Sequence, residues 1–293
     1  MLVVMFYTTA ERKQILRNVN KSYKEHSMKK LLLRSRIAIG VSITASVATL
    51  LAVCVLLYFI LQMTTATDVS GVVEKCLPTS VMILTEKTIG TEDSGEIVQE
   101  AATGIIWKKE TDTIYIATNN HVVKNATKIF IRFGLEKAQG MLIPGEIVGR
   151  EASSDLAVIS VSKKDIPDEI YRELKPAVLG SSKETKVGQA AILIGNALGE
   201  GINVSCGIVS AVNRRQDGDE FHSEVLVSDA AVNFGNSGSM LVDKKGRVIG
   251  INTSKDSKDG SEGMGYYVPV DVAKKVVDQL LDQMRSLFFV QRK

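Results

Sequence analysis

The sequence predicts an all-β domain of two barrels with a C-terminal helix, preceded by one N-terminal transmembrane helix. Three observations lead to this fold class: an uncharged apolar run near the N-terminus, a series of short β-type segments after it, and one helical pattern near the C-terminus. With 293 residues, of which 45% are hydrophobic and 24% charged, the chain has room for one globular domain or two small ones.

The apolar run comes first along the chain. Residues 37–67 contain no charged side chain, and residues 37–63 consist mainly of Ile, Val, Leu and Ala. This length exceeds the roughly 20 apolar residues with which a helix crosses a bilayer. A buried core helix would need apolar neighbours on all sides, and a cleaved signal peptide has an apolar region of about 7–15 residues. The run therefore favours a retained signal anchor, with cleavage around 64–67 left open.

The basic residues are concentrated before this run. Residues 1–36 carry nine Lys or Arg and two acidic residues, whereas the rest of the chain has 27 basic and 31 acidic residues. The positive-inside rule therefore predicts a cytoplasmic N-terminus and places the larger C-terminal part outside the cell membrane. No nucleic-acid partner is expected, because the net charge of +3 comes from the tail and the rest of the chain is mildly acidic.

Short β-type segments, separated by turns rich in Gly, Asn, Asp and Lys, follow a polar linker at 64–71. They are expected at 80–85, 103–107, 113–117, 128–133, 140–149, 156–161, 190–194, 207–212, 223–228, 239–242, 247–252 and 265–270. Many short strands at such spacing are typical of a β-barrel or sandwich. The polar segment 163–186, with Pro167 and Pro176, divides them into two barrels at about 72–165 and 180–270.

The one clear helical pattern is expected at 271–284, with Asp271 placed to cap it. Its apolar residues recur at helical spacing: Val272, Val276, Val277, Leu280 and Leu281. The folded domain is thus expected to span 72–284, after a basic tail at 1–36 and before an apolar tail at 285–293.

The cysteines and histidines predict neither a disulfide framework nor a metal site. Cys54 lies in the apolar run, whereas Cys76 and Cys206 lie in the part expected outside, where a bridge can persist. Their spacing does not give their distance, so a paired and an unpaired state both stay open. The three histidines are far apart in the chain, and no phosphate-binding or dinucleotide motif occurs. We therefore expect no metal and no cofactor.

A histidine, an aspartate and a serine occur in that order, each beside an apolar strand-like run. They are His121 in the segment TNNHVV, Asp155 in SDLAV and Ser237 in GNSGS. Each has a plain interpretation on its own: a structural histidine, a turn-capping aspartate and a Gly/Ser/Asn turn. Together they match the needs of a serine nucleophile, which requires a base near neutral pKa and a carboxylate that orients this base.

The glycines around Ser237 allow a tight turn in which the amides of Gly235 and Ser237 can point together at an oxyanion. Strand-like segments flank this turn, so it differs from the strand-to-helix elbow of α/β-hydrolases. The combination predicts a nucleophilic hydrolase.

The region from about Val72 to Leu281 resembles the protease domain of the HtrA (Deg) family of trypsin-like serine endopeptidases. The histidine, aspartate and serine segments above carry this resemblance, the last with its preceding DAAVN at 229–233. Supporting stretches are IGN at 194–196, GIVSA at 207–211, VIGINT at 248–253 and GYYVPV at 265–270.

The resemblance implies two six-stranded barrels with His121 as general base, Asp155 as its orienting carboxylate and Ser237 as nucleophile in the cleft between them. It also implies an oxyanion hole formed by the amides of Gly235 and Ser237. Ala231 would lie at the base of the primary specificity pocket, and one wall would be formed by Ile251, Asn252 and Thr253. Such a pocket, without a charge, should accept small or medium aliphatic side chains.

Three features depart from the family pattern. Ser239 stands where a second glycine is usual, although glutamyl endopeptidases share the sequence GNSGS. Phe234 replaces a residue that is commonly Pro or polar. The chain also ends at Lys293, where the family normally continues into PDZ domains, so peptide capture by such a domain is not expected.

The leading hypothesis is a membrane-anchored, extracytoplasmic serine endopeptidase that cleaves unfolded or misfolded proteins, with a homo-oligomer, a trimer, implied by the resemblance. The alternative is a non-catalytic chaperone or sensor that retains the protease fold. A glutamyl-specific enzyme ranks last, because residues 250–254 supply no histidine or cation to bind an acidic side chain.

Overall fold

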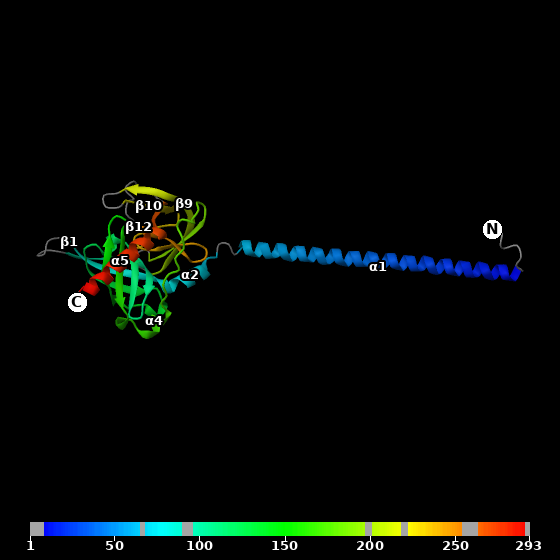
Figure 1. Cartoon of the computed structure of the whole chain (residues 1–293), viewed down its shortest axis with the longest axis horizontal. Helices are drawn as coiled ribbons and strands as arrows, with labels where there is room; N and C mark the ends of the chain where they lie inside the picture. The colour runs from blue at the N-terminus through cyan, green and yellow to red at the C-terminus, as the bar shows by residue number, and fades with distance from the viewer. Residues whose placement is uncertain are drawn as a thin grey trace. The chain divides into compact units, whose positions relative to one another are not determined.

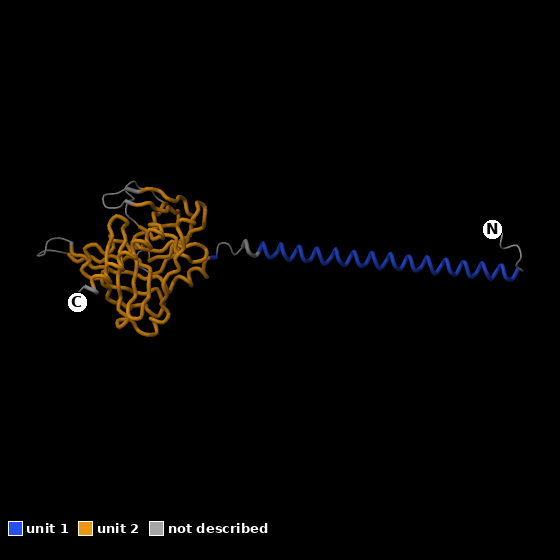
Figure 2. Tube along the Cα trace, in the orientation of Figure 1, with its two compact units in different colours: residues 1–68 blue, residues 69–293 orange. Residues whose placement is uncertain are grey.

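The computed structural model describes residues 9–64, 68–89, 96–196, 201–217, 222–253 and 263–290. The chain forms two units, residues 1–68 and 69–293 (Figure 2). In the first unit, α1 (Thr9–Thr64) is one continuous helix of 56 residues. Among the described residues it is the one helix that is long and apolar enough to cross a membrane, a property that signal sequences share. Helix α1 thus contains residues 9–36 of the basic tail and the whole apolar run at 37–63.

The second unit begins with a short helix, α2 (Ser70–Cys76), where the sequence predicts the end of a linker. Its first sheet has the strand order β5-β4-β1-β2-β3-β7-β6. The bounds are β1 (Ser80–Ile89), β2 (Glu96–Lys109), β3 (Thr113–Thr118), β4 (Ala126–Phe133), β5 (Ile143–Pro144), β6 (Glu146–Glu151) and β7 (Leu156–Ser162). A helical turn, α3 (Asn120–Val123), follows β3.

This sheet counts seven strands, rather than the six expected, because one segment bends at Gly145. The bend separates β5, which pairs with β4, from β6, which pairs with β7 on the opposite edge. Gly145 passes so close to the sheet that a Cβ there would lie 2.8 Å from Ile159 Cγ2. Pro144, just before the bend, has no N–H for a ladder. The consecutive strands β5 and β6 therefore connect the two edges of the sheet.

The second sheet is the closed six-stranded barrel that the sequence predicts. Its order is β10-β13-β12-β11-β8-β9. The bounds are β8 (Ala190–Gly195), β9 (Asn203–Asp217), β10 (His222–Ser228), β11 (Met240–Val242), β12 (Val248–Thr253) and β13 (Gly265–Pro269). Between the two sheets, α4 (Asp168–Glu173) interrupts the expected polar connection. Ile170 and Leu174, four residues apart, are buried in the first barrel and hold this segment in place.

The C-terminal helix α5 (Val270–Val290) packs against β6 and β7 of the first sheet and against β12 and β13 of the second. Val277 and Leu281 lie in a buried cluster to which both sheets contribute. A Cβ on Gly149 of β6 would lie 2.9 Å from Leu280 Cδ2, so this glycine permits the close approach of the helix. Helix α5 is thus a shared support for both barrels, as the orange-to-red helix in Figure 1 shows.

The predicted cap role of Asp271 is wrong. Helix α5 starts at Val270, so Asp271 lies in its first turn, and its carboxylate accepts bonds from Ser181 Oγ at 2.9 Å, Ser182 Oγ at 3.0 Å and the Lys183 amide at 3.1 Å. Burial opposes its ionisation, but these bonds and Lys274 hold the pKa of Asp271 well below its ordinary value. Asp271 therefore anchors the segment that leads into β8.

Cys76 and Cys206, for which the sequence left a bridge open, do not pair. Cys76 is buried and Cys206 is exposed, and both are free thiols. Burial raises the pKa of the Cys76 thiol to about 11, which keeps it protonated and unreactive at neutral pH.

Candidate active site

His121 lies in the single turn α3, directly after β3. Val122 and Val123 of this turn are buried in the first barrel, so the turn is fixed against the core. The two preceding asparagines attach it to the backbone of Asp155: the Asn119 side chain donates to the Asp155 carbonyl at 3.0 Å and the Asn120 amide donates to it at 3.1 Å. The histidine is therefore held by a rigid element beside the aspartate.

Asp155 lies in the turn between β6 and β7, with its backbone in the left-handed region at φ +53°. The next residues, beginning with Leu156, are fully buried and draw the turn inward. Its carboxylate is fully buried and accepts three bonds: the His121 amide at 2.9 Å, His121 Nδ1 at 2.7 Å and Thr253 Oγ1 at 2.7 Å. These bonds offset the desolvation of a buried charge, and a strained backbone is typical of functional positions.

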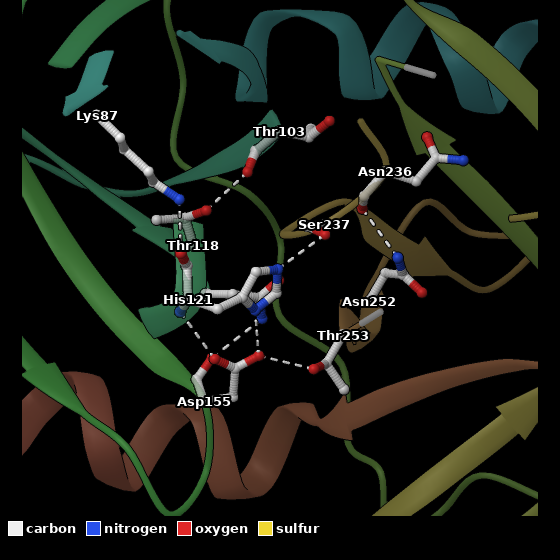
Figure 3. Close-up of polar contacts among 10 residues, drawn as sticks. Lys87, Thr103, Thr118, His121, Asp155, Asn236, Ser237, Asn252 and Thr253 are labelled. Carbon is white, nitrogen blue, oxygen red and sulfur yellow. Dashed lines mark hydrogen bonds and ion pairs between the residues drawn. The ribbon is translucent and has the colours of Figure 1, made fainter. Parts of the chain in front are cut away.

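Ser237 completes a chain of hydrogen bonds that crosses from the first barrel to the second. His121 Nε2 lies 3.0 Å from Ser237 Oγ (Figure 3). With the proton of the imidazole on Nδ1, where Asp155 accepts it, Nε2 is free to accept the hydroxyl proton of Ser237. The three residues predicted from separate segments are thus brought together in the order carboxylate, imidazole, hydroxyl.

The loop before Ser237 forms a turn in which the Asn236 amide donates to the Asn233 carbonyl at 3.1 Å. Gly235, at the third position of this turn, has φ +91°. A positive φ there is typical of a type II turn, which favours glycine. Thr103 Oγ1 of β2 donates to the Gly235 carbonyl at 2.8 Å and fixes the orientation of the loop.

The loop after Ser237 is held just as closely. Gly238 has φ +81°, and a Cβ there would lie 2.1 Å from the Thr103 carbonyl oxygen. The Gly238 amide donates to the Asn252 carbonyl at 2.9 Å, and the Thr103 amide donates to the Ser237 carbonyl at 2.8 Å. Strand β2 of one barrel and strand β12 of the other therefore both fix the serine.

Ser239, one of the departures from the family pattern, fits because Gly195 makes room for it. Its side chain is fully buried, and a Cβ on Gly195 would lie 1.9 Å from Ser239 Oγ. The Ser239 hydroxyl has no hydrogen-bond partner among the described residues. The second departure, Phe234, is 90% exposed beside the nucleophile.

The four residues predicted for the specificity pocket do not share one environment in the structure. Ala231 is exposed, and its carbonyl accepts a bond from Ser205 Oγ at 2.8 Å. Ile251 is buried in the core that α5 shares with both barrels. The Asn252 side chain donates to the Asn236 carbonyl at 3.0 Å, and Thr253 donates to Asp155. The side chains of Asn252 and Thr253 therefore support the loop before Ser237 and Asp155, respectively, whereas that of Ile251 packs in the core.

Thr103 contributes to the site although it was not predicted from the sequence, and Thr253, expected in the wall of the pocket, contributes its hydroxyl to the bond with Asp155. Their hydroxyl groups bond to Gly235 and Asp155 only because strands distant in sequence meet here. Within the ranges that the structure describes, no group of His, Cys, Asp and Glu side chains could hold a metal ion.

Comparison with known proteins agrees with this geometry. The trypsin-like peptidase domain matches residues 102–251. "Serine protease Do-like HtrB" of Bacillus subtilis (strain 168) is 36% identical over 231 residues, which cover 74% of this chain and 48% of that protein. "Periplasmic serine endoprotease DegP" of Escherichia coli (strain K12) is 34% identical over 174 residues, which cover 59% and 34%.

Solved structures give the same result. The HtrA-type protease AlgW, solved with a decapeptide, superimposes with a TM-score of 0.61 at 28% identity, covering 74% of this chain and 68% of that one. AlgW with a tripeptide gives a TM-score of 0.61 at 30% identity, with 74% and 64% covered. The chain spans about half or less of the length of these curated relatives. It belongs to the trypsin-like peptidase family, and within this family to the HtrA-type serine proteases.

Proposed function

We propose that this chain is a membrane-anchored serine endopeptidase that cleaves unfolded or misfolded proteins on the extracytoplasmic side. The observation that carries the proposal is the hydrogen-bond chain from Asp155 through His121 to Ser237, with distances of 2.7 and 3.0 Å. A nucleophile, a base and an orienting carboxylate within hydrogen-bond reach are the arrangement that acyl transfer requires.

In the proposed reaction, His121 Nε2 takes the proton of Ser237 as the hydroxyl oxygen attacks the carbonyl carbon of the scissile peptide bond. The imidazolium that forms is stabilised by Asp155, whose carboxylate faces Nδ1–H. It then donates its proton to the leaving amine, and an acyl-enzyme remains. Water, deprotonated by His121, attacks this ester, and the return of the proton to Ser237 releases the product acid.

The negative charge that develops on the carbonyl oxygen needs donors that are already in place. The amides of Gly235 and Ser237 are proposed for this role. The left-handed backbone of Gly235 and the bond from Thr103 to its carbonyl support the proposal, because they fix the orientation of the peptide groups around Ser237. A preorganised donor of this type is worth about 2.7–4 kcal/mol of transition-state stabilisation.

The pocket is proposed to accept small or medium aliphatic side chains. Ala231 contributes only a methyl group, and the nearby carboxylate of Asp229 accepts the Ile208 amide at 2.6 Å. On the neighbouring strand, a Cβ on Gly265 would lie 2.6 Å from Val232 Cγ2 and 2.8 Å from the Tyr267 hydroxyl. This limited space, together with the bond that Asp229 already accepts from Ile208, favours short apolar substrates.

The proposed location follows from helix α1. Its apolar part is long enough to cross a bilayer, and its basic part precedes the apolar part. Both features support a cytoplasmic N-terminus and an extracytoplasmic protease domain. This orientation can be tested in intact cells with a thiol reagent that does not cross the membrane. The reagent should label the introduced cysteine of Ser160→Cys, in the protease domain, and not that of Ser35→Cys, in the part expected to be cytoplasmic.

The catalytic proposal is tested with the full chain in detergent, by fluorophosphonate labelling and by cleavage of unfolded casein. We expect wild type to be labelled and active, and Ser237→Ala to lose both properties. Ser160→Ala serves as a matched control, because this hydroxyl on β7 contacts only the Glu146 carbonyl at 3.4 Å. Absence of labelling in folded wild type would contradict the proposal and favour the binding-only alternative.

A further inference from the structure

Lys87 is a nearly buried cation that lies beside the proposed base. Its side chain is only 15% exposed, and its ammonium lies 2.5 Å from Glu100 Oε2 on the neighbouring strand. The same group donates to the backbone carbonyl of His121 at 3.2 Å (Figure 3). Because lysine is rarely buried without partners, this placement requires an explanation.

The pairing of β1 with β2 explains how Lys87 and Glu100 meet. Lys87 pairs with Val98 and Thr85 pairs with Glu100, in a register without a shift, so Lys87 and Glu100 are diagonal neighbours on one face of the sheet. On the other side of β1, the extra residue Thr127 forms a β-bulge in β4, and bulges are frequent beside active sites. From this position the ammonium of Lys87 reaches the carbonyl of His121 in α3.

The carbonyl of His121 has a clear need for such a donor. Helix α3 has a single turn, and its internal bond runs from the Lys124 amide to the Asn120 carbonyl at 2.8 Å. The later carbonyls of a helix lack partners within the helix, and a cation near them is favourable. Lys87 therefore holds the backbone of His121 from its carbonyl, while Asp155 holds the amide and the ring.

We propose that Lys87 is a positioning residue for His121. The Lys87 ammonium fixes the backbone of His121 so that the imidazole lies within hydrogen-bond distance of both Asp155 and Ser237. Glu100 acts as its counter-ion and keeps the ammonium directed at α3. The inference rests on the proposed protease function, because it assigns a role in the same reaction. A displacement of about 1 Å in a reacting group can lower the rate by about 100-fold, so a backbone anchor of the base affects turnover.

The test compares substitutions in the full chain. We expect Lys87→Met to lower kcat about 10-fold with KM within about twofold of wild type, and Lys87→Arg to restore most of the activity because it keeps a cationic donor. Lys128→Met is the matched control: Lys128 also pairs with a glutamate of this sheet, Glu86, at 3.0 Å, but is 62% exposed. It should keep the activity of wild type.

The split between kcat and KM separates positioning from general support of the fold. Folded Lys87→Met should bind substrate as wild type does and turn it over more slowly. Lys87→Arg should recover this turnover, because its guanidinium can still donate to the carbonyl of His121 and pair with Glu100.

Three results would overturn the inference: unchanged kcat in folded Lys87→Met, an equal loss in Lys128→Met, or a loss that Lys87→Arg does not reverse. Inactive wild type would contradict the proposed function instead. A crystal structure of Lys87→Met, or of Lys87→Gln if the Met variant does not fold, then still tests the positioning. We expect the distance from His121 Nε2 to Ser237 Oγ to exceed 3.0 Å, and an unchanged distance would refute the role of Lys87.

Discussion

The hydroxyl of Thr253 offers a direct measure of how much the active site depends on the second barrel. Thr253 is 1% exposed and donates to Oδ2 of Asp155 at 2.7 Å, whereas Asp155 belongs to the first barrel. Substitution by Val keeps the branched shape of the side chain and removes the donor. The buried carboxylate then keeps its two bonds from His121 and loses the third.

The stability lost in Thr253→Val can be estimated from the charge of the acceptor, the carboxylate of Asp155. A hydrogen bond to a charged group contributes about 1.5–3 kcal/mol, so Thr253→Val should destabilise the folded state by about 2 kcal/mol. For a domain of this size, such a loss lowers Tm by roughly 4–8 °C. If a similar amount is lost when Asp155 stabilises the imidazolium in the transition state, kcat/KM falls about 10- to 100-fold.

Two assays check these values: thermal unfolding of the Ser237→Ala form, which cannot digest itself, and kcat/KM with a peptide substrate in the form with an intact nucleophile. Thr253→Ser retains the hydroxyl and should recover most of both quantities. A Thr253→Val protein with the Tm and kcat/KM of wild type would refute the reasoning, since it would mean that the bond to Asp155 contributes nothing.

Three further predictions concern single positions. Gly238→Ala should abolish activity and destabilise the fold by more than about 3 kcal/mol in urea unfolding, because its Cβ would lie 2.1 Å from the Thr103 carbonyl oxygen. The control is Gly188→Ala, which is also at positive φ (+83°) but has open space around it. It should cost only about 1–2 kcal/mol. Asp271→Asn should cost about 2 kcal/mol at pH 7. Since the pKa of Asp271 is lowered by folding, this difference should be complete above pH ~4 and disappear as the pH falls further, as unfolding at several pH values would show. Tyr267→Phe should leave stability unchanged or raise it by about 1 kcal/mol, because the buried hydroxyl has no partner among the described residues; a clear loss in thermal unfolding would reveal one.

The local sequence contains enough information to predict the strands and the three residues that form the proposed triad. Segments such as Leu156–Ser162 combine β-branched residues with nearby turn signals, and His121, Asp155 and Ser237 occur at the ends of such segments. These features depend on neighbouring residues in the chain, so periodicity and glycine spacing reveal them.

Other features depend on contacts between distant segments and have no local signal. The role of Asp271 is set by Ser181 and Ser182, about 90 residues away, rather than by the helix in which it lies. The space for Ser239 is supplied by Gly195 on another strand. The pairing of Lys87 with Glu100 depends on the register of β1 and β2 and is not visible in the sequence of either strand.

The hydrogen bonds at Asp155 and Ser237 link the proposed activity to the folding of both barrels. In the proposed mechanism each barrel contributes only part of the machinery: His121 and Asp155 come from one, and Ser237 and Thr253 come from the other. A chain with only one barrel folded would therefore lack the hydrogen-bond chain that is proposed to activate Ser237. Reaction with an active-site probe would then count only molecules in which both barrels have formed and docked.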